Sequence, residues 1–252
     1  MKILLNLSYV GTAYCGYQVQ KNGVSIQQRL NEAAKALFGF DCDIVGCSRT
    51  DKGVHANEFC ATVSKKGENS ISSTIPENAI PKAFNSYLPG DICVRSAKYV
   101  DDDFHARYDV KYKEYVYKIY TAELPDPFLY RRVWNRCRTV SDAELEKMNE
   151  AAGAFVGKYD FSAFMASGSS VSDTVREVVS ARVVRNGDLI EFYVAADGFL
   201  YNMVRIMTGT LIAVAEGKIQ SNEIRDIIKS GDRSRAGMTA PPDGLYLNRV
   251  EY

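Results

Sequence analysis

The densest group of side chains that could do chemistry lies in one polar run between two predicted strands. The run reads Gly46-Cys47-Ser48-Arg49-Thr50-Asp51-Lys52-Gly53-Val54-His55-Ala56. Loops carried by a rigid sheet are the usual place for functional residues, and Asp51 is the one carboxylate of this loop. A structural alternative stays open, because Asp-x-Gly is also typical of a turn in which the carboxylate accepts backbone N–H groups and the glycine supplies a positive φ.

A second candidate is Arg205, the only charged residue from Gly198 to Ala215. It lies in a predicted helix that is otherwise mostly apolar. An unpaired buried guanidinium costs about 3 to 5 kcal/mol, so the charge needs a carboxylate partner or must reach water along its alkyl stem. The sequence leaves both possibilities open.

Tyrosines and lysines are interleaved along a third predicted element, a strand that contains Tyr115. Its members are Tyr112, Tyr115, Tyr117 and Tyr120, with Lys111, Lys113 and Lys118. Strands of this kind often stack unpaired bases on their aromatic rings. The same residues are equally common in a strand of the hydrophobic core, and the pattern alone slightly favours the core interpretation. From Phe104 to Arg138, eight basic minus four acidic residues leave a local charge of +4, which permits contacts with phosphate.

The composition limits the class of protein. The chain has 252 residues, 46% apolar and 25% charged, as in an ordinary globular protein. Its 31 Lys and Arg balance 31 Asp and Glu, which argues against a uniformly basic nucleic-acid coat. Six cysteines without C-x-x-C spacing indicate neither a zinc knuckle nor a redox pair, and they are expected to be small buried hydrophobes. P-loop, zinc-deaminase and Ser-His hydrolase motifs are missing. We expect a soluble cytoplasmic protein without a membrane segment.

The elements that must position these residues follow a β-α-β-β-α-β order in the first half of the chain. Strands are expected at residues 2–9, 43–47, 58–63 and 92–99. One helix follows a predicted capping box of Ser25 and Gln28 and is closed by Gly39, and a second helix runs from the prolines at 76 and 81 to about Tyr87. This order is that of the split, ferredoxin-like unit.

The second half is expected to repeat the order. Strands are predicted at residues 108–120, 175–185, 189–195 and 244–252, with helices after a Ser141–Glu144 capping box, at 199–216 and at 221–230. We therefore predict an α+β fold of two ferredoxin-like (split β-α-β) lobes, residues 1–103 and 104–252, with mainly antiparallel sheets and a catalytic cleft between them.

In this order the motifs resemble the TruA-type tRNA pseudouridine synthases, over nearly the full chain. The matching residues are Tyr9-Val10-Gly11-Thr12, Gly16-Tyr17-Gln18, Arg49 to Ala56, Asn85, Leu88-Pro89, Phe104-His105-Ala106-Arg107-Tyr108, Tyr115-Val116-Tyr117, Asp160-Phe161, Phe164, Met203-Val204-Arg205, Gly209, Pro242 and Gly244-Leu245. Each motif alone is weak, but together and in this order they are highly specific.

The resemblance implies an enzyme that detaches uracil from a uridine in the anticodon stem-loop of tRNA (positions 38–40), rotates it and rejoins it through carbon. Asp51 falls on the catalytic aspartate and Arg205 on the arginine expected to pair with it. Tyr115 matches the tyrosine that packs against the target base, Arg49 the side chain that fills the space left by the flipped base, and Leu245 the segment that lines the uracil pocket. It implies no metal and no cofactor, and a homodimer that binds each tRNA across both chains.

Physical chemistry is consistent with these implied roles. Extruding a stacked base costs a few kcal/mol, which a filling side chain and a stacking ring reduce. A neighbouring guanidinium favours the ionised form of Asp51, which could act as a nucleophile or abstract a proton from the sugar. The sequence does not choose between those two roles. Lys52 stands where many bacterial members have alanine, so an added cation beside the loop could alter which uridines are chosen.

Two other hypotheses remain. A non-catalytic RNA-binding or RNA-folding protein would need Tyr115 and the lysines, but an acid in its groove would repel phosphate. In an RNA-independent α+β protein, all the tyrosines would be core residues. His55 and His105 are expected to make structural hydrogen bonds rather than to transfer protons.

Overall fold

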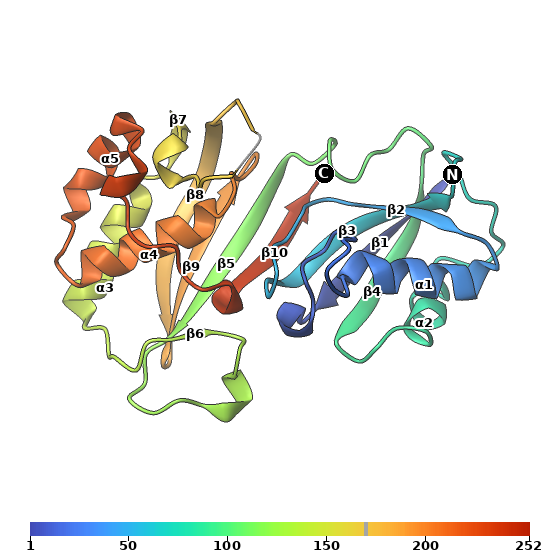
Figure 1. Ribbon diagram of the computed structural model, residues 1–252, viewed down its shortest axis with the longest axis horizontal. Coiled ribbons are helices and arrows are strands. Elements are labelled where there is room, and N and C mark those ends of the chain that lie inside the picture. The colour runs from blue at the N-terminus through green and yellow to red at the C-terminus, as the bar shows by residue number, and fades with distance from the viewer. Residues whose placement is uncertain (169–170) are drawn as a thin grey trace. The chain divides into compact units, whose positions relative to one another are not determined.

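The computed structural model describes residues 1–168 and 171–252 and has a mixed α+β architecture (Figure 1). The chain divides into two compact units: residues 1–111 with 246–252 form unit 1, and residues 112–245 form unit 2. The predicted α+β class and mainly antiparallel strand pairing are confirmed. The expected lobe boundary near Asp103 lies inside unit 1, and most of the last strand groups with unit 1 instead of the second half of the chain.

Unit 1 is built on antiparallel strands in the order β4-β1-β3-β2. These strands are β1 (Lys2–Tyr9), β2 (Cys42–Gly46), β3 (His55–Lys65) and β4 (Ile92–Val100). With the two helices between them, they follow the expected β-α-β-β-α-β order. β3 starts three residues earlier than predicted, so the end of the polar run belongs to a strand.

β3 pairs with β1 on one edge, and on its other edge the beginning and the end of the strand have different partners. β2 pairs with the part of β3 near Lys65, whereas β10 (Leu245–Glu251) pairs in parallel with its beginning. Tyr246 lies opposite His55 and Leu247 opposite Ala56. The end of the chain therefore supports the strand that follows the Asp51 loop.

Helices α1 (Ile26–Phe38) and α2 (Ile80–Asn85) lie on the same side of this sheet, and their aromatic rings meet edge to face, Phe38 on Phe84 at 6.0 Å (Figure 1). Ser25 caps α1 as predicted, and Gly39 ends it with φ +77°. The other half of the predicted capping box is wrong, because the Gln28 side chain does not accept from the Ser25 N–H at the helix start, and its amide group donates to Glu32 at 2.9 Å.

Unit 2 has antiparallel strands in the order β5-β9-β8-β7, with the short β6 parallel to β5. They are β5 (Tyr112–Tyr120), β6 (Trp134–Asn135), β7 (Gly157–Asp160), β8 (Val175–Asn186) and β9 (Leu189–Ala196). The strand expected from residue 108 begins only at 112, because residues 104–109 form turns held by His105.

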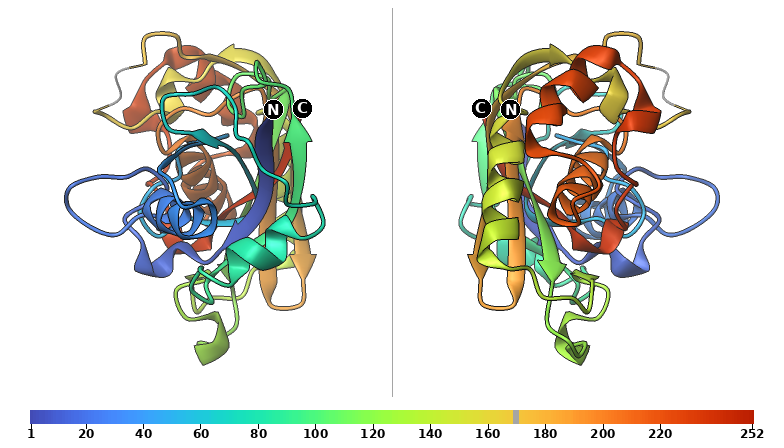
Figure 2. Two further views of the ribbon diagram at one scale, coloured as in Figure 1. Left: turned by 90° about the vertical axis from the view of Figure 1, so that its right-hand side faces the viewer. Right: turned by 90° about the vertical axis from the view of Figure 1, so that its left-hand side faces the viewer.

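The helices of unit 2 are α3 (Asp142–Gly153), α4 (Met203–Ala215) and α5 (Ile224–Ser230) (Figure 2). The rings of Phe155, Phe164 and Phe192 pack together under them. α4 begins four residues later than expected, because Asn202 adopts a left-handed backbone (φ +60°) that a continuous helix cannot contain.

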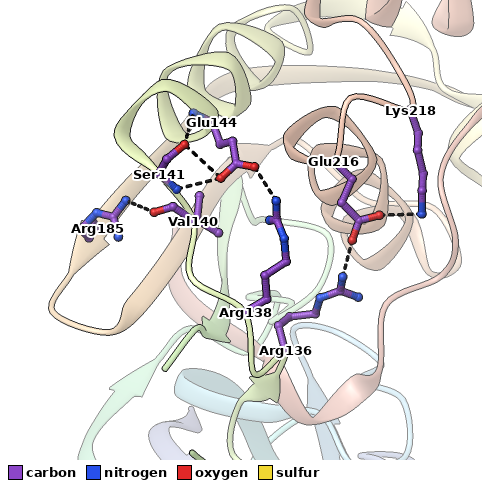
Figure 3. Close-up of polar contacts among 8 residues, drawn as sticks. All are labelled: Arg136, Arg138, Val140, Ser141, Glu144, Arg185, Glu216 and Lys218. Carbon is purple, nitrogen blue, oxygen red and sulfur yellow. Dashed lines mark hydrogen bonds and ion pairs between the residues drawn. The ribbon is translucent and has the colours of Figure 1, made fainter. Parts of the chain in front are cut away.

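Ion pairs fix the segment between β6 and α3 (Figure 3). The predicted capping box is confirmed: Ser141 and Glu144 bond reciprocally at the start of α3. Arg138 pairs with Glu144, while Arg136 pairs with Glu216 at the end of α4. This segment is therefore tied to two helices.

Candidate active site

Asp51 lies in the loop of residues 47–54 between β2 and β3, and backbone hydrogen bonds hold this loop on both sides of it. The Tyr17 N–H donates to the Thr50 carbonyl at 3.1 Å, and the Val54 N–H donates to the Asp51 carbonyl at 3.1 Å. The hydroxyls of Tyr9 and Thr50 share a buried hydrogen bond of 2.8 Å. The Asp51 side chain is half-buried on a loop whose backbone is fixed.

Two glycines let the segment after β1 press against the back of this loop. A Cβ on Gly11 would lie 1.9 Å from the Val54 carbonyl oxygen, and one on Gly16 would lie 2.6 Å from that of Thr50. Gly16 also has φ +103°, a conformation that suits glycine. The Tyr9–Gln18 motif and the Asp51 motif are separate in the sequence, but their backbones are in direct contact in the structure.

Both histidines make the structural hydrogen bonds expected of them. The buried His55 accepts from the Gly11 N–H through Nδ1 at 3.0 Å, and its ring stacks on Tyr246 at 4.5 Å. His105 Nδ1 accepts from the N–H groups of Arg107 and Tyr108 at 3.1 and 3.2 Å. His55 therefore locks the same close approach that Gly11 permits.

The cysteines fulfil the expectation of buried hydrophobes only in part. Cys42, Cys47 and Cys60 are buried, Cys15 and Cys93 are half-buried, and Cys137 is exposed. Burial raises the pKa of Cys60 to about 12, so this thiol stays protonated at neutral pH. The Cys60 N–H donates to Cys47 Sγ at 3.4 Å at the base of the Asp51 loop.

In unit 2, Arg205 lies in the first turn of α4 and is held by acceptors on both sides. Its Nε donates to the Ala240 carbonyl at 2.7 Å, and a terminal nitrogen donates to Asn202 Oδ1 at 2.6 Å. The left-handed backbone of Asn202 comes directly before the helix. The guanidinium is therefore oriented by its own unit and is not a loose surface cation.

The segment that supplies the Ala240 carbonyl lies very close to α4. A Cβ on Gly209 would lie 1.8 Å from the Met238 carbonyl oxygen. The Ala240 N–H also donates to the Arg205 carbonyl at 3.1 Å. The structure thus explains why a glycine stands at 209, a position that the resemblance includes: it allows the close contact that positions Arg205.

β5 carries Tyr115 and Tyr117, whose rings have different surroundings. Tyr115 meets Phe199 edge to face at 5.0 Å, and only 7% of it is exposed. Tyr117 is fully buried, and its hydroxyl donates to the Pro241 carbonyl at 2.6 Å. Burial raises the pKa of Tyr117 above its ordinary value, an effect that the charge of Arg205 opposes. Tyr117 is therefore a core residue, as expected if this strand belongs to the hydrophobic core.

Leu245 follows directly on the segment that Tyr117 supports. A Cβ on Gly244 would lie 2.6 Å from the Tyr117 ring, so only glycine fits at that position. Leu245 itself is buried. Tyr117 thus links β5 both to the segment beside Arg205 and to the residue before Leu245.

The five predicted site residues fall into two groups. Arg49 and Asp51 lie on one loop of unit 1, where Arg49 is exposed, as is Lys52. Arg205, Tyr115 and Leu245 lie in unit 2.

Sequence reasoning named Tyr9, Tyr17, Thr50 and Tyr117 only as motif residues, did not predict that they support the two groups, and missed Asn202. For the Asp51 loop the supporting residues are the Tyr9–Thr50 pair and Tyr17, and for Arg205 they are Asn202 and the Tyr117 hydroxyl. Asn202 lies inside the helix predicted at 199–216, where a polar residue directly before an apolar stretch is the signal of a later helix start.

Within residues 1–168 and 171–252, no three or more His, Cys, Asp or Glu side chains are grouped so as to hold a metal ion. No helix in these residues is long and apolar enough to span a membrane.

Comparison with known proteins gives the family. A sequence model described as tRNA pseudouridine synthase matches residues 7–109 and 151–252. The chain belongs to this family. Among relatives, it is 43% identical over 250 residues to tRNA pseudouridine synthase A of Thermoanaerobacter sp. (strain X514), covering 99% of both chains. It is 42% identical over 250 residues to tRNA pseudouridine synthase A of Acetivibrio thermocellus, covering 99% of both chains. It is 41% identical over 251 residues to the protein of the same name from Citrifermentans bemidjiense, covering 99% of this chain and 97% of the relative.

The predicted resemblance to the pseudouridine synthase family is thereby confirmed. A solved Cbf5-Nop10-Gar1 complex contains a chain with 12% identity and a TM-score of 0.35, covering 96% of this chain and 57% of its own. That likeness is too weak to carry an argument. The family match covers both the Asp51 loop and the α4 segment.

Proposed function

We propose that this protein is a tRNA uridine isomerase that converts uridine to pseudouridine in the anticodon stem-loop, at tRNA positions 38–40. The observation that carries the proposal is Asp51 on a loop fixed from behind by a second family motif, in a chain related over its whole length to proteins named tRNA pseudouridine synthase A. A carboxylate held in place before the substrate arrives needs no reorganisation during the reaction.

The reaction requires an exchange of two bonds at one sugar carbon. The bond between C1′ and N1 of uracil breaks, the base rotates, a bond from C1′ to C5 forms, and the proton on C5 leaves to solvent. Asp51 serves this exchange as a nucleophile or as the base that takes a sugar proton. In either role it must be ionised, which a guanidinium partner favours, and we assign that partner to Arg205.

The remaining residues handle the target nucleotide. The uridine must leave its stack before reaction, at a cost of a few kcal/mol. We assign Arg49 to the space that the base leaves, because its side chain is exposed on the Asp51 loop. Tyr115 stacks on the extruded uracil and Leu245 lines its pocket. No metal or cofactor takes part in this scheme.

The wider context belongs to the same proposal. The protein acts in the cytoplasm as a homodimer, and each tRNA binds across both chains. A dimer would assemble local basic patches into a groove, which a chain with no net charge needs in order to bind RNA. Lys52 is exposed beside Asp51 and would touch phosphate near the target.

The test uses an unmodified tRNA transcript labelled with tritium at C5 of uracil. Wild type should release tritium to water, and Asp51→Asn should release none while binding the transcript with similar affinity. Asp103→Asn serves as the matched control, because Asp103 is an exposed acid of the same unit. It should behave like wild type.

Two results would contradict the proposal. Tritium release by Asp51→Asn at the wild-type rate would remove the role of Asp51. Tight binding of the transcript without release by wild type would favour the alternative, a non-catalytic RNA-binding protein.

A further inference from the structure

Among the described residues of unit 2, the loop between β5 and β6 carries the large apolar side chains that are most exposed. This loop, residues 121–133, is here called the arm, and it projects from the end of β5 (Figure 1). Three of its large side chains are open to solvent: Leu124 is 76% exposed, Phe128 85% and Tyr130 76%. Such a group of large apolar side chains is typical of a contact surface.

The foot of the arm is firmly anchored. Trp134, which follows the arm, is buried and meets the core residue Tyr117 edge to face at 6.1 Å. Arg136 lies over the Trp134 ring at 4.9 Å. The arm therefore rises from a base that is packed against the core.

A hollow of about 300 Å³ lies between the arm and the end of β5. Its walls are mostly rings and aliphatic side chains, and its polar edge is made by Asp126, Arg131 and Asn135. The apolar lining consists of Tyr120, Pro125, Pro127, Leu129, Tyr130 and Val133. This volume is at the small end of the range for ligand pockets, roughly 300–1,000 Å³, and suits one planar ring system.

The chemistry of the hollow matches a nucleobase. A base offers two apolar faces to rings and a polar edge to hydrogen-bonding groups, and RNA-binding proteins take up unstacked bases in this way. Arg132, exposed on the arm, supplies a cation for the neighbouring phosphates. The acids of the arm are Glu123 and Asp126, and Asp126 is engaged in capping the turn that begins at Pro127. The arm has no net charge, so rings carry its recognition.

The arm also contacts the segment next to Leu245. Arg131 has a left-handed backbone (φ +54°), and its Nε donates to Asp243 Oδ1 at 3.3 Å. Strained non-glycine residues cluster at functional sites. Asp243 is two residues before Leu245, so this contact joins the arm to the segment assigned to the uracil pocket.

We propose that this hollow binds an unpaired nucleobase of the substrate tRNA, distinct from the target uridine, by stacking against Tyr130. The inference rests on the proposed tRNA substrate. It adds a second contact that would help to choose among tRNAs.

The test measures the Kd of full-length protein for an unmodified tRNA transcript. Stacking on one ring contributes about 1–3 kcal/mol, so Tyr130→Ala should weaken binding at least about fivefold. Tyr130→Phe keeps the ring and should bind like wild type. Tyr87→Ala removes a 53%-exposed tyrosine of unit 1 and should have no effect.

A second variant keeps the test decisive if Tyr130→Ala folds poorly. Leu129→Trp fills the hollow without deleting a ring, and it should weaken binding to a similar extent. Wild-type affinity in either well-folded variant would overturn the inference. So would a change in oligomeric state, with the affinity per active chain unchanged, because the arm would then be a contact between copies.

Tritium release, measured on the same proteins, separates the inference from the function on which it rests. If wild type binds transcript without releasing tritium, and Tyr130→Ala still weakens binding, the proposed reaction fails while the base-binding hollow stands. If wild type is active and Tyr130→Ala has wild-type affinity and KM, the hollow fails alone.

Discussion

The Asp51 loop and the Arg205 helix start are held in opposite ways. Backbone meets backbone behind Asp51, where Gly11 and Gly16 leave no space for a further atom. Arg205 is instead held by acceptors placed around its guanidinium, on Asn202 and Ala240. Substitutions that add atoms behind the Asp51 loop should therefore reduce stability and activity. At the start of the Arg205 helix, substitutions that remove atoms should do so.

The largest effect is expected from adding one methyl group, in Gly11→Ala. Its Cβ would lie 1.9 Å from the Val54 carbonyl oxygen, and neither backbone can move without displacing the Asp51 loop. Overpacking costs typically 1–3 kcal/mol and occasionally more, so we expect a loss of about 3 kcal/mol in the free energy of unfolding and almost no tritium release.

Denaturant unfolding and the release assay check this prediction, with Gly39→Ala as the control. A Cβ at Gly39 meets nothing within 4 Å, although its φ of +77° also favours glycine. Gly11→Ala should therefore lose clearly more stability than Gly39→Ala. Equal losses would mean that backbone conformation, not close contact, makes Gly11 necessary.

Removing the guanidinium, in Arg205→Ala, is expected to abolish activity and to lower stability by about 1–2 kcal/mol. The variant leaves the Asn202 and Ala240 acceptors without their charged donor, and hydrogen bonds to charged groups contribute about 1.5–3 kcal/mol. Arg205→Lys keeps the charge but not the planar geometry, so it should recover little activity. Full activity with an unchanged Tm would show that Arg205 is neither catalytic nor structural.

A smaller loss is expected for Tyr117→Phe. It removes only the hydroxyl that donates to Pro241, worth about 0.5–1.5 kcal/mol, and keeps the ring against Gly244. If Tyr117 positions the Leu245 segment, KM for tRNA should rise while kcat changes little. A Tm decrease with unchanged KM would limit Tyr117 to stability.

The smallest effect on stability is expected at Glu144, which belongs to neither group of predicted site residues. Hydrogen bonding from the Ser141 backbone and then the Arg138 guanidinium hold the pKa of this carboxyl below its ordinary value. Because the folded-state pKa is depressed, the stabilisation is present above the unfolded pKa and is lost as the pH falls through the folded one. Glu144→Gln should therefore be less stable than wild type at pH 7 and equal to it in acid, with tritium release unchanged. A difference in Tm that is independent of pH would contradict this assignment.

Local signals in the sequence predicted the elements that depend on local physics. The α3 capping box and the α1 cap are made within a few residues, so residue types alone reveal them. β6 and β7 escaped prediction because strands of two and four residues are too short to show alternation. The parallel pairing of β10 with β3 joins residues about 190 positions apart, and no local pattern encodes that.

The candidate site likewise combines features that the local sequence reveals with contacts between distant residues that it does not. Asp51 and Arg205 stood out because each is a charge of unusual setting in the sequence. Gly11 and Gly16 have the glycine spacing of a P-loop but not its Lys-Ser/Thr, and they belong to the motifs of the resemblance, but their close approach to the Asp51 loop appears only in three dimensions. Motif order in the chain therefore indicated which residues matter, and through-space contacts indicate why.

The pairing of β10 with β3 also has a consequence for biosynthesis. Ribosomes make a chain from its first residue onward, yet the strand that follows the Asp51 loop receives its parallel neighbour only when residues 246 and 247 have been added. One edge of β3 at residues 55 and 56 therefore has no strand neighbour until residues 246 and 247 have been made. A nascent chain that stalls before residue 246 should present this strand to chaperones or to aggregation partners, although it already contains every residue of the Asp51 loop.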